Sequence, residues 1–181
     1  MTKGSALGMI LFIASESVFF LLLILAYVNF HKSTGETAAH MLDPAKTGIF
    51  SLALLASSLT LLFAERERKK ENAVFKLWLL STILLGAAFL VGQGMEYSHL
   101  LTHQVTISRD LFGSTFFTLT GFHGLHVFFG LVLLSLLLSL SFWGQKQEPP
   151  IAGIQSVAIY WHFVDAVWIL IFSVVYLWRY V

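Results

Sequence analysis

Five long apolar runs, separated by short polar segments, dominate the sequence. A helix needs about 20 consecutive apolar residues to cross the hydrocarbon core of a bilayer. Each run reaches or approaches that length, so the pattern predicts an all-α fold: an integral membrane bundle of five transmembrane helices in a single domain over residues 1–181. The expected spans are 4–30, 47–64, 77–101, 111–143 and 152–178.

The positions of the basic residues predict how this bundle is oriented, because cytoplasmic loops carry an excess of Lys and Arg. With the N-terminus inside, the cytoplasmic side holds Lys3, Arg66, Arg68, Lys69, Lys70, Lys76 and Lys146. The outer side then holds only Lys32, Lys46, Arg109 and Arg179. We therefore expect a cytoplasmic N-terminus and an outer C-terminus. The first run is too long for a signal-peptide core, so we expect it to remain as a span.

Small and aromatic residues add two expectations about how the spans are placed. Small side chains let helices approach closely in lipid, and here they are Gly86, Ala87, Gly121, Gly124 and Gly130. Tyr and Trp favour the membrane–water interface. Towards the ends of the last two spans, the residues expected at that interface are Trp143, Tyr160, Trp161, Tyr176, Trp178 and Tyr180.

Composition supports a membrane protein and excludes several other classes. Hydrophobic residues make up 57% of the chain and charged residues 12%, whereas a typical soluble domain is about 25% charged. A net charge of +1 gives no basic field for nucleic acid, and the basic run at 66–70 ends a span, where it ordinarily determines topology. The absence of cysteine excludes a disulfide framework, a thiolate nucleophile and a Cys-ligated metal.

Ionisable side chains inside the apolar runs are the candidate functional residues. A charge at bilayer depth costs about 2.5–3.5 kcal/mol on insertion scales, so such groups normally face partners and carry a function. Counted at about 1.5 Å per residue, five of them fall in one layer near the midplane. This buried polar layer consists of Glu16, His123, His126, His162 and Asp165. A second polar stripe, near the outer end of the third span, consists of Gln93, Glu96 and Tyr97.

Two interpretations of the midplane layer stay open. Imidazoles and carboxylates on facing helices can bind a metal in a bundle core, but the spacing lacks the Glu-x-x-His repeat of di-iron bundles. The alternative is a hydrogen-bonded network across the first, fourth and fifth spans, joining Glu16, His123, His162 and Asp165. In it, Asp165 interacts directly with His162, its i,i+3 neighbour, and fixes its tautomer. We expect this network, with either a structural role or a role in proton movement, and we assign no metal ligand and no catalytic residue.

Five segments contain all eight of these candidate residues. The segments are 8–20 (GMILFIASESVFF), 93–97 (QGMEY), 106–110 (TISRD), 113–127 (GSTFFTLTGFHGLHV) and 160–168 (YWHFVDAVW). In order and composition they resemble the successive signatures of subunit III of haem–copper terminal oxidases. The resemblance runs from about residue 4 to the C-terminus.

This resemblance implies an accessory subunit that carries no haem, copper or other redox centre and has no catalytic activity alone. In the family, such a subunit packs against catalytic subunit I, supports sustained turnover and helps to keep proton uptake fast. Subunit I reduces oxygen and subunit II receives electrons from cytochrome c, so haem and copper belong to partner subunits. The expected partners are subunit I, by direct contact, and subunit II, with subunit IV and a bound phospholipid as further candidates. Glu16 matches the buried acid of the family's Ser-Glu motif.

The expected setting is aerobic respiration and proton translocation in a bacterial cytoplasmic (inner) membrane. The mitochondrial form has seven helices and this chain begins where its third would start, whereas bacterial oxidases include five-helix versions. The runner-up is subunit III of a quinol oxidase or of a nitric-oxide-reductase-associated homologue, but Ser15-Glu16 and the GFH sequence at 121–123 favour cytochrome c oxidase. An autonomous proton-coupled transporter would also place ionisable groups at the midplane. Such transporters typically show inverted repeats and broken helices, whereas the three prolines here lie in loops.

Overall fold

Five long helices make up most of the structure. The computed structural model describes residues 3–34, 42–67, 73–107, 111–143 and 151–177. The helices are α1 (Lys3–Thr34), α3 (Pro44–Glu67), α4 (Ala73–Thr102), α5 (Leu111–Trp143) and α6 (Ile151–Phe172), and α6 continues into a π-helix, η2 (Ser173–Leu177). These ranges contain no strand, and the five helices are long and apolar enough to cross a membrane. The predicted all-α bundle of five membrane-spanning helices is confirmed.

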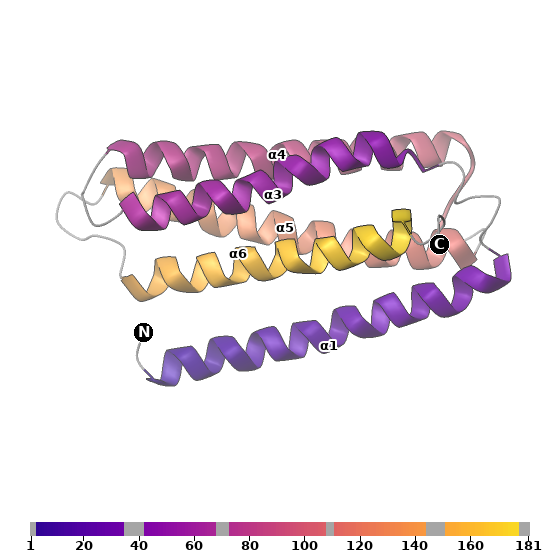
Figure 1. Ribbon diagram of the computed structural model, residues 1–181, viewed down its shortest axis with the longest axis horizontal. Coiled ribbons are helices and arrows are strands. Elements are labelled where there is room, and N and C mark those ends of the chain that lie inside the picture. The colour runs from indigo at the N-terminus through magenta and orange to yellow at the C-terminus, as the bar shows by residue number, and fades with distance from the viewer. Residues whose placement is uncertain (1–2, 35–41, 68–72, 108–110, 144–150, 178–181) are drawn as a thin grey trace.

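The helices lie side by side with successive helices antiparallel, and the N- and C-termini lie at opposite ends of the bundle (Figure 1). α3 packs along α4, while α5 contacts α1, α4 and α6. α1 lies along the edge of the bundle opposite α3 and α4, where it packs against α5 and α6 (Figure 1). Only 6% of its most apolar stretch is buried within the chain, against 44% for the last span. α6 is therefore the central helix and α1 the peripheral one.

The first residues of α3 show how local sequence sets a helix boundary. Asp43 Oδ1 accepts hydrogen bonds from the backbone N–H groups of Ala45 and Lys46, both at 3.1 Å. Pro44 takes the first helical position, where its missing N–H is not needed. The hydrogen bonds from the Lys46 backbone and ammonium group lower the pKa of Asp43. The second span consequently begins three residues earlier than expected, at Pro44 rather than at 47.

The end of α4 is set by a Schellman motif. Val105 N–H donates to the Leu100 carbonyl at 3.1 Å, and Gln104 N–H donates to the Leu101 carbonyl at 3.0 Å. Gln104 has a φ of 62°, the left-handed conformation that this motif requires. The side chains of Leu100 and Val105 are both buried, as the hydrophobic contact of the motif predicts. These hydrogen bonds and the buried pair of side chains fix the backbone at the C-terminus of α4.

Two tryptophans of α6 fill the centre of the bundle. Trp161 and Trp168 are buried. Their Nε1–H groups donate to two serines of α3, Ser57 Oγ at 3.0 Å and Ser51 Oγ at 2.9 Å respectively. Each indole therefore buries a large apolar surface while its one polar group keeps a partner.

Three residues of the expected interfacial belt are covered by neighbouring helices, and their position at the membrane–water interface stays a prediction. Trp161, Tyr160 and Tyr176 are 0%, 6% and 1% exposed and lie inside the bundle. Their hydroxyl and indole groups find protein partners there, so they need no water at the interface. The side chains of Trp143, Trp178 and Tyr180 lie outside the described part of the chain.

Trp161 lies between two glycines on neighbouring helices. A Cβ atom at Gly86 of α4 would lie 2.7 Å from Trp161 Cη2, and one at Gly130 of α5 would lie 2.6 Å from Trp161 Cε3. Both distances are far shorter than van der Waals contact. These two small residues, which the sequence marked as packing positions, thus accommodate an indole ring.

We predict that Gly130→Ala destabilises the bundle, because the enclosed ring of Trp161 has no room to withdraw from a methyl group. Overpacking of this kind typically costs about 1–3 kcal/mol. Gly94→Ala is the matched control, since nothing lies within 4 Å of a Cβ atom at that position. Its free energy of unfolding should stay the same or rise, because alanine is the better helix former and no atom opposes its methyl group. Denaturant unfolding of the detergent-solubilised chain measures the free energies of unfolding of both variants. Equal effects of the two substitutions would contradict the close contact between Gly130 and the Trp161 ring.

Candidate functional site

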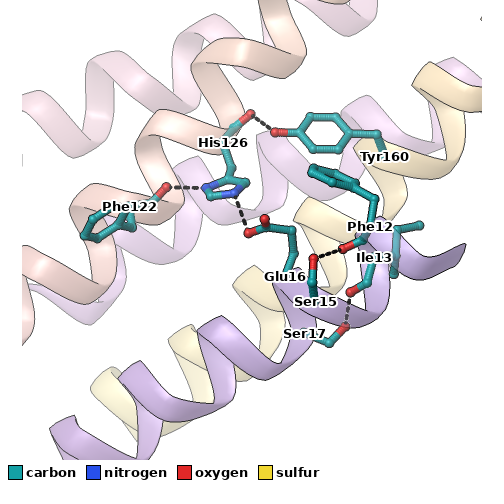
Figure 2. A network of polar contacts seen from close by, with 8 residues as sticks. All are labelled: Phe12, Ile13, Ser15, Glu16, Ser17, Phe122, His126 and Tyr160. Carbon is teal, nitrogen blue, oxygen red and sulfur yellow. Dashed lines mark hydrogen bonds and ion pairs between the residues drawn. The ribbon is translucent and has the colours of Figure 1, made fainter. Parts of the chain in front are cut away.

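An ionisable pair joins α1 to α5 near the middle of the length of both helices. His126 Nε2 lies 3.1 Å from Glu16 Oε2, and the two side chains remain 16% and 22% exposed respectively. Figure 2 shows the Glu16 carboxyl group pointing from α1 towards the imidazole ring. The other ring nitrogen, Nδ1, lies 2.7 Å from the backbone carbonyl oxygen of Phe122. Both nitrogens of His126 are therefore engaged.

The Phe122 carbonyl determines where one proton of this pair resides. A carbonyl oxygen only accepts hydrogen bonds, so His126 Nδ1 carries a proton and donates it. The contact between Nε2 and Glu16 Oε2 then needs one further proton, held either on the imidazole as an ion pair or on the carboxyl group as a neutral pair. Without that proton, a lone pair would face a carboxylate oxygen. The geometry is therefore suited to holding one proton between α1 and α5.

Aromatic residues surround this pair and connect it to α6. The Tyr160 hydroxyl donates to the backbone carbonyl of His126 at 3.0 Å. The ring of Phe20 meets the His126 ring edge-on with centroids 4.9 Å apart, and Phe12 lies 6.1 Å from the Tyr160 ring. These contacts replace water around the pair with apolar rings, and a low dielectric strengthens interactions between charges.

The neighbouring serines of α1 do not extend the pair into a chain of hydrogen bonds. Ser15 Oγ donates to the Phe12 carbonyl and Ser17 Oγ to the Ile13 carbonyl, both at 2.7 Å within the same helix (Figure 2). A hydroxyl bonded in this way satisfies itself locally. Glu16 is thus connected to the bundle through His126.

A second polar cluster joins α3 to α6. The Ser58 hydroxyl donates to Asp165 Oδ2 and lies 2.9 Å from His162 Nδ1. Because its one proton goes to Asp165, Ser58 accepts the hydrogen bond from His162 Nδ1–H. His162 and Asp165 are therefore linked through Ser58 rather than by the expected direct contact. Asp165 Oδ1 and His162 Nε2 are buried and have no hydrogen-bond partner among the described residues.

His123 stands apart from both clusters. Its side chain is fully buried, and neither ring nitrogen has a hydrogen-bond partner in the described part of the chain. The ring stacks on Trp168 with centroids 4.7 Å apart and meets Phe89 edge-on at 5.8 Å. The five midplane residues thus form a pair, a Ser-bridged cluster and an isolated histidine, where we expected one network across three helices.

The predicted outer stripe divides into two contacts, of which the first ties α3, α4 and η2 together. Glu96 Oε1 accepts a hydrogen bond from Thr47 Oγ1 at 2.9 Å, and Glu96 Oε2 accepts one from the Tyr176 hydroxyl at 2.6 Å. Tyr176 belongs to the π-helix, a wider turn that is common at functional sites. Both carboxyl oxygens of Glu96 therefore have partners on other elements.

The second contact of the stripe ties α4 to α5. Gln93 Nε2 donates to the Thr120 carbonyl at 2.7 Å and to the Tyr97 hydroxyl at 3.1 Å. The Tyr97 hydroxyl also lies 2.7 Å from Thr120 Oγ1. A Cβ atom at Gly124 would lie 2.7 Å from Gln93 Oε1, so this glycine provides the space that the amide needs.

The sequence analysis missed the polar face of α3. Its members provide partners for a carboxylate, two indoles and the His–Asp cluster, and they are Thr47, Ser51, Ser57 and Ser58. Thr47, Ser51 and Ser58 recur at i, i+4 and i+11, which places them on one face of a helix. That periodicity within an apolar run was the available signal.

The polar groups described above can hold protons and form hydrogen bonds between neighbouring helices. Among the residues that the structure describes, no group of three or more His, Asp or Glu side chains could hold a metal ion. The Glu16–His126 pair is the one contact above in which two ionisable side chains lie within hydrogen-bond distance of each other.

Comparison with known proteins establishes the family. A family profile described as cytochrome c oxidase subunit III matches residues 1–180. The chain belongs to the cytochrome c oxidase subunit III family. The resemblance found in the motifs is therefore confirmed, and the family is one of non-redox subunits.

Bacterial members are among the relatives of this subunit III chain. Cytochrome c oxidase subunit 3 of Synechocystis sp. is 38% identical, over 94% of this chain and 74% of that protein. Probable cytochrome c oxidase subunit 3 of Mycobacterium leprae is 35% identical, over 94% of this chain and 86% of that protein. The Corynebacterium diphtheriae protein is 37% identical with the same two coverages, 94% and 86%. The similarity thus extends over nearly the whole chain.

We predict that Ser58→Ala lowers the free energy of unfolding by about 1–3 kcal/mol, because it leaves His162 Nδ1–H and Asp165 Oδ2 buried without their partner. Ser81→Ala is the control, since this half-buried serine donates only to the carbonyl of Leu77 in its own helix. It should change stability by less than about 0.5 kcal/mol. If Ser58→Ala unfolds at the same denaturant concentration as the wild type, the bridge contributes nothing to the bundle.

Proposed function

We propose that this chain is the accessory, non-redox subunit of a respiratory cytochrome c oxidase in a bacterial cytoplasmic membrane. It packs directly against subunit I, which reduces oxygen, and it supports sustained turnover and fast proton uptake. Membership of the subunit III family supports the oxidase assignment, and the bacterial relatives support the location. Cytochrome c is proposed as the electron donor because these relatives are named cytochrome c oxidase subunits. The chain itself carries no haem or copper and catalyses nothing alone.

The Glu16–His126 pair carries the proposal of a role in proton uptake. It holds one proton at the seam between α1 and α5, and part of both side chains is exposed at the side of the bundle. Lipid is an unfavourable neighbour for such a pair, so we propose that a neighbouring part of the oxidase covers it. A change in its protonation alters the local charge, and that charge acts strongly on nearby groups where the dielectric is low.

This influence is modulatory because α1 offers no proton route of its own. Between the N-terminal end of α1 and Glu16, the polar side chains of the helix are only Lys3, Ser5 and Ser15. They are too sparse for a relay, and Ser15 already donates to a carbonyl of its own helix. We propose that the pair acts on a proton route in subunit I through its field and its hydrogen bonds, with no proton passing through this chain.

We further propose a cytoplasmic N-terminus and an outer C-terminus. The Lys and Arg count along the sequence supports this orientation. Arg66 near the end of α3 and Lys76 near the start of α4 then lie on the cytoplasmic side. Subunit II and subunit IV are further candidate partners, and the exposed apolar face of α1 is a candidate surface for phospholipid.

We predict that Glu16→Gln in the complete oxidase changes steady-state oxygen reduction by less than about tenfold, equivalent to about 1.4 kcal/mol. The glutamine amide can donate to His126 Nε2, so the contact between α1 and α5 survives while the exchangeable proton is lost. Ser17→Ala, on the same helix, should match the wild type because its hydroxyl bonds only the Ile13 carbonyl. Oxygen consumption by the purified complex gives the rates. Abolished turnover in an intact Glu16→Gln complex would make Glu16 an obligatory proton carrier and overturn the accessory assignment.

We predict that an oxidase lacking this subunit keeps its haem absorption spectrum and reduces oxygen, but slows at high turnover and inactivates faster. The reason is that the redox centres lie in other subunits, whereas proton supply loses a supporting element. Visible spectra together with progress curves of oxygen consumption separate the two effects. Missing haem bands in the depleted complex would show that this chain holds a redox centre after all.

A further inference from the structure

Two histidines lie together at the C-terminal end of α4, apart from the polar groups described above. His99 is in the last turn of the helix, and His103 follows at i+4. Both side chains are exposed, and their ring centroids are 4.4 Å apart with an angle of 44° between the planes. Residues at i and i+4 share one face of a helix, so both imidazoles face the same region of space.

The hydrogen bonds of His103 prepare this ring for a ligand. His103 Nδ1 lies 2.8 Å from the backbone carbonyl oxygen of His99. A carbonyl only accepts, so Nδ1 carries the proton and the lone pair of the neutral ring lies on Nε2. Metal-ligating histidines almost always donate their other ring N–H in this way, often to a backbone carbonyl. His103 therefore has the tautomer and the support of a ligating histidine.

The ring of His99 can bind the same ion as His103. Among the described residues, no side chain forms a hydrogen bond with the His99 ring, so either nitrogen can turn towards the point that His103 Nε2 faces. Metal–nitrogen bonds of about 2.0–2.1 Å are compatible with two rings at this separation after a small rotation. The pair can thus bind one ion with two nitrogens.

The backbone around the pair is already ordered and electrostatically favourable. The Schellman motif that ends α4 spans Leu100 to Val105 and holds His103 between its two hydrogen bonds. The C-terminus of a helix carries partial negative charge, which favours a cation. A cation bound here therefore requires little reorganisation of the chain.

We propose that His99 and His103 form a two-histidine site for a borderline divalent cation of the Zn²⁺ or Cu²⁺ class. Imidazole suits both ions, and water fills the remaining coordination positions. With two protein ligands the ion is exchangeable. When bound, it links the two side chains and stabilises the last turn of α4. It goes beyond the expectation of a chain without metal ligands and is independent of the role proposed for Glu16.

The test is calorimetric titration of the full-length chain in detergent with Zn²⁺ alone. We expect saturable binding, and we expect His99→Gln and His103→Gln each to weaken it by more than about tenfold, or about 1.4 kcal/mol. The spacing control combines His99→Gln with Leu101→His, which keeps the number of histidines but places them at i and i+2. Leu101 is 53% exposed, so the substitution is not expected to disturb the core. This variant should bind as weakly as His99→Gln.

Two further measurements make the result decisive if a variant folds poorly. Zn²⁺ should raise the unfolding temperature of the wild type, as any ligand of the folded state does, and electron paramagnetic resonance of the Cu²⁺-loaded wild type should show two nitrogen ligands. A double variant of the remaining histidines outside the membrane layer, His31→Gln with His40→Gln, should keep full affinity. Wild-type affinity in the spacing control, loss of binding in the His31/His40 variant, or no saturable binding by the wild type would overturn the proposal.

Discussion

The absence of competing water is the constraint on which the rest of this structure depends. In a bilayer, polar groups must find partners within the protein, and the bundle meets this need mainly with short hydroxyl side chains. Ser51 and Ser57 accept hydrogen bonds from the two buried indoles, and Ser58 bridges His162 to Asp165. These serines all belong to α3. That helix therefore provides the hydrogen-bond partners that allow the polar groups of α6 to lie in an apolar environment.

α1 differs from the other helices in how it meets this need for polar partners. α3, α4, α5 and α6 share the buried hydroxyl contacts, whereas α1 is largely exposed and attaches to α5 and α6, in part through the buried rings of Phe20 and Tyr27. Its polar attachment is the Glu16–His126 pair, supported by rings such as Phe20. The contact that holds α1 to α5 is therefore one between two ionisable side chains.

The polar contacts at two depths of the bundle differ in how completely their groups are hydrogen-bonded. The contacts towards the C-terminal end of α4 tie Glu96 to Thr47 and Tyr176, so three elements meet there around a single carboxyl group. The midplane instead retains polar atoms without described partners, including both ring nitrogens of His123. Buried polar groups are normally satisfied. These atoms are enclosed by this chain, so a neighbouring subunit cannot reach them.

The sequence alone determined the five spans, the membrane class, the family and the ionisable residues at membrane depth, because length, hydropathy and motif order are properties of the chain itself. Helical periodicity also identified which residues share one face of a helix. Only the tertiary structure decided that Glu16 pairs with His126, that Ser58 joins His162 to Asp165, and that Trp161 lies inside the bundle. These pairings depend on how each helix is rotated about its axis relative to its neighbours. That rotation is set by packing between helices, such as the indole between Gly86 and Gly130, and no pattern within a single span encodes it.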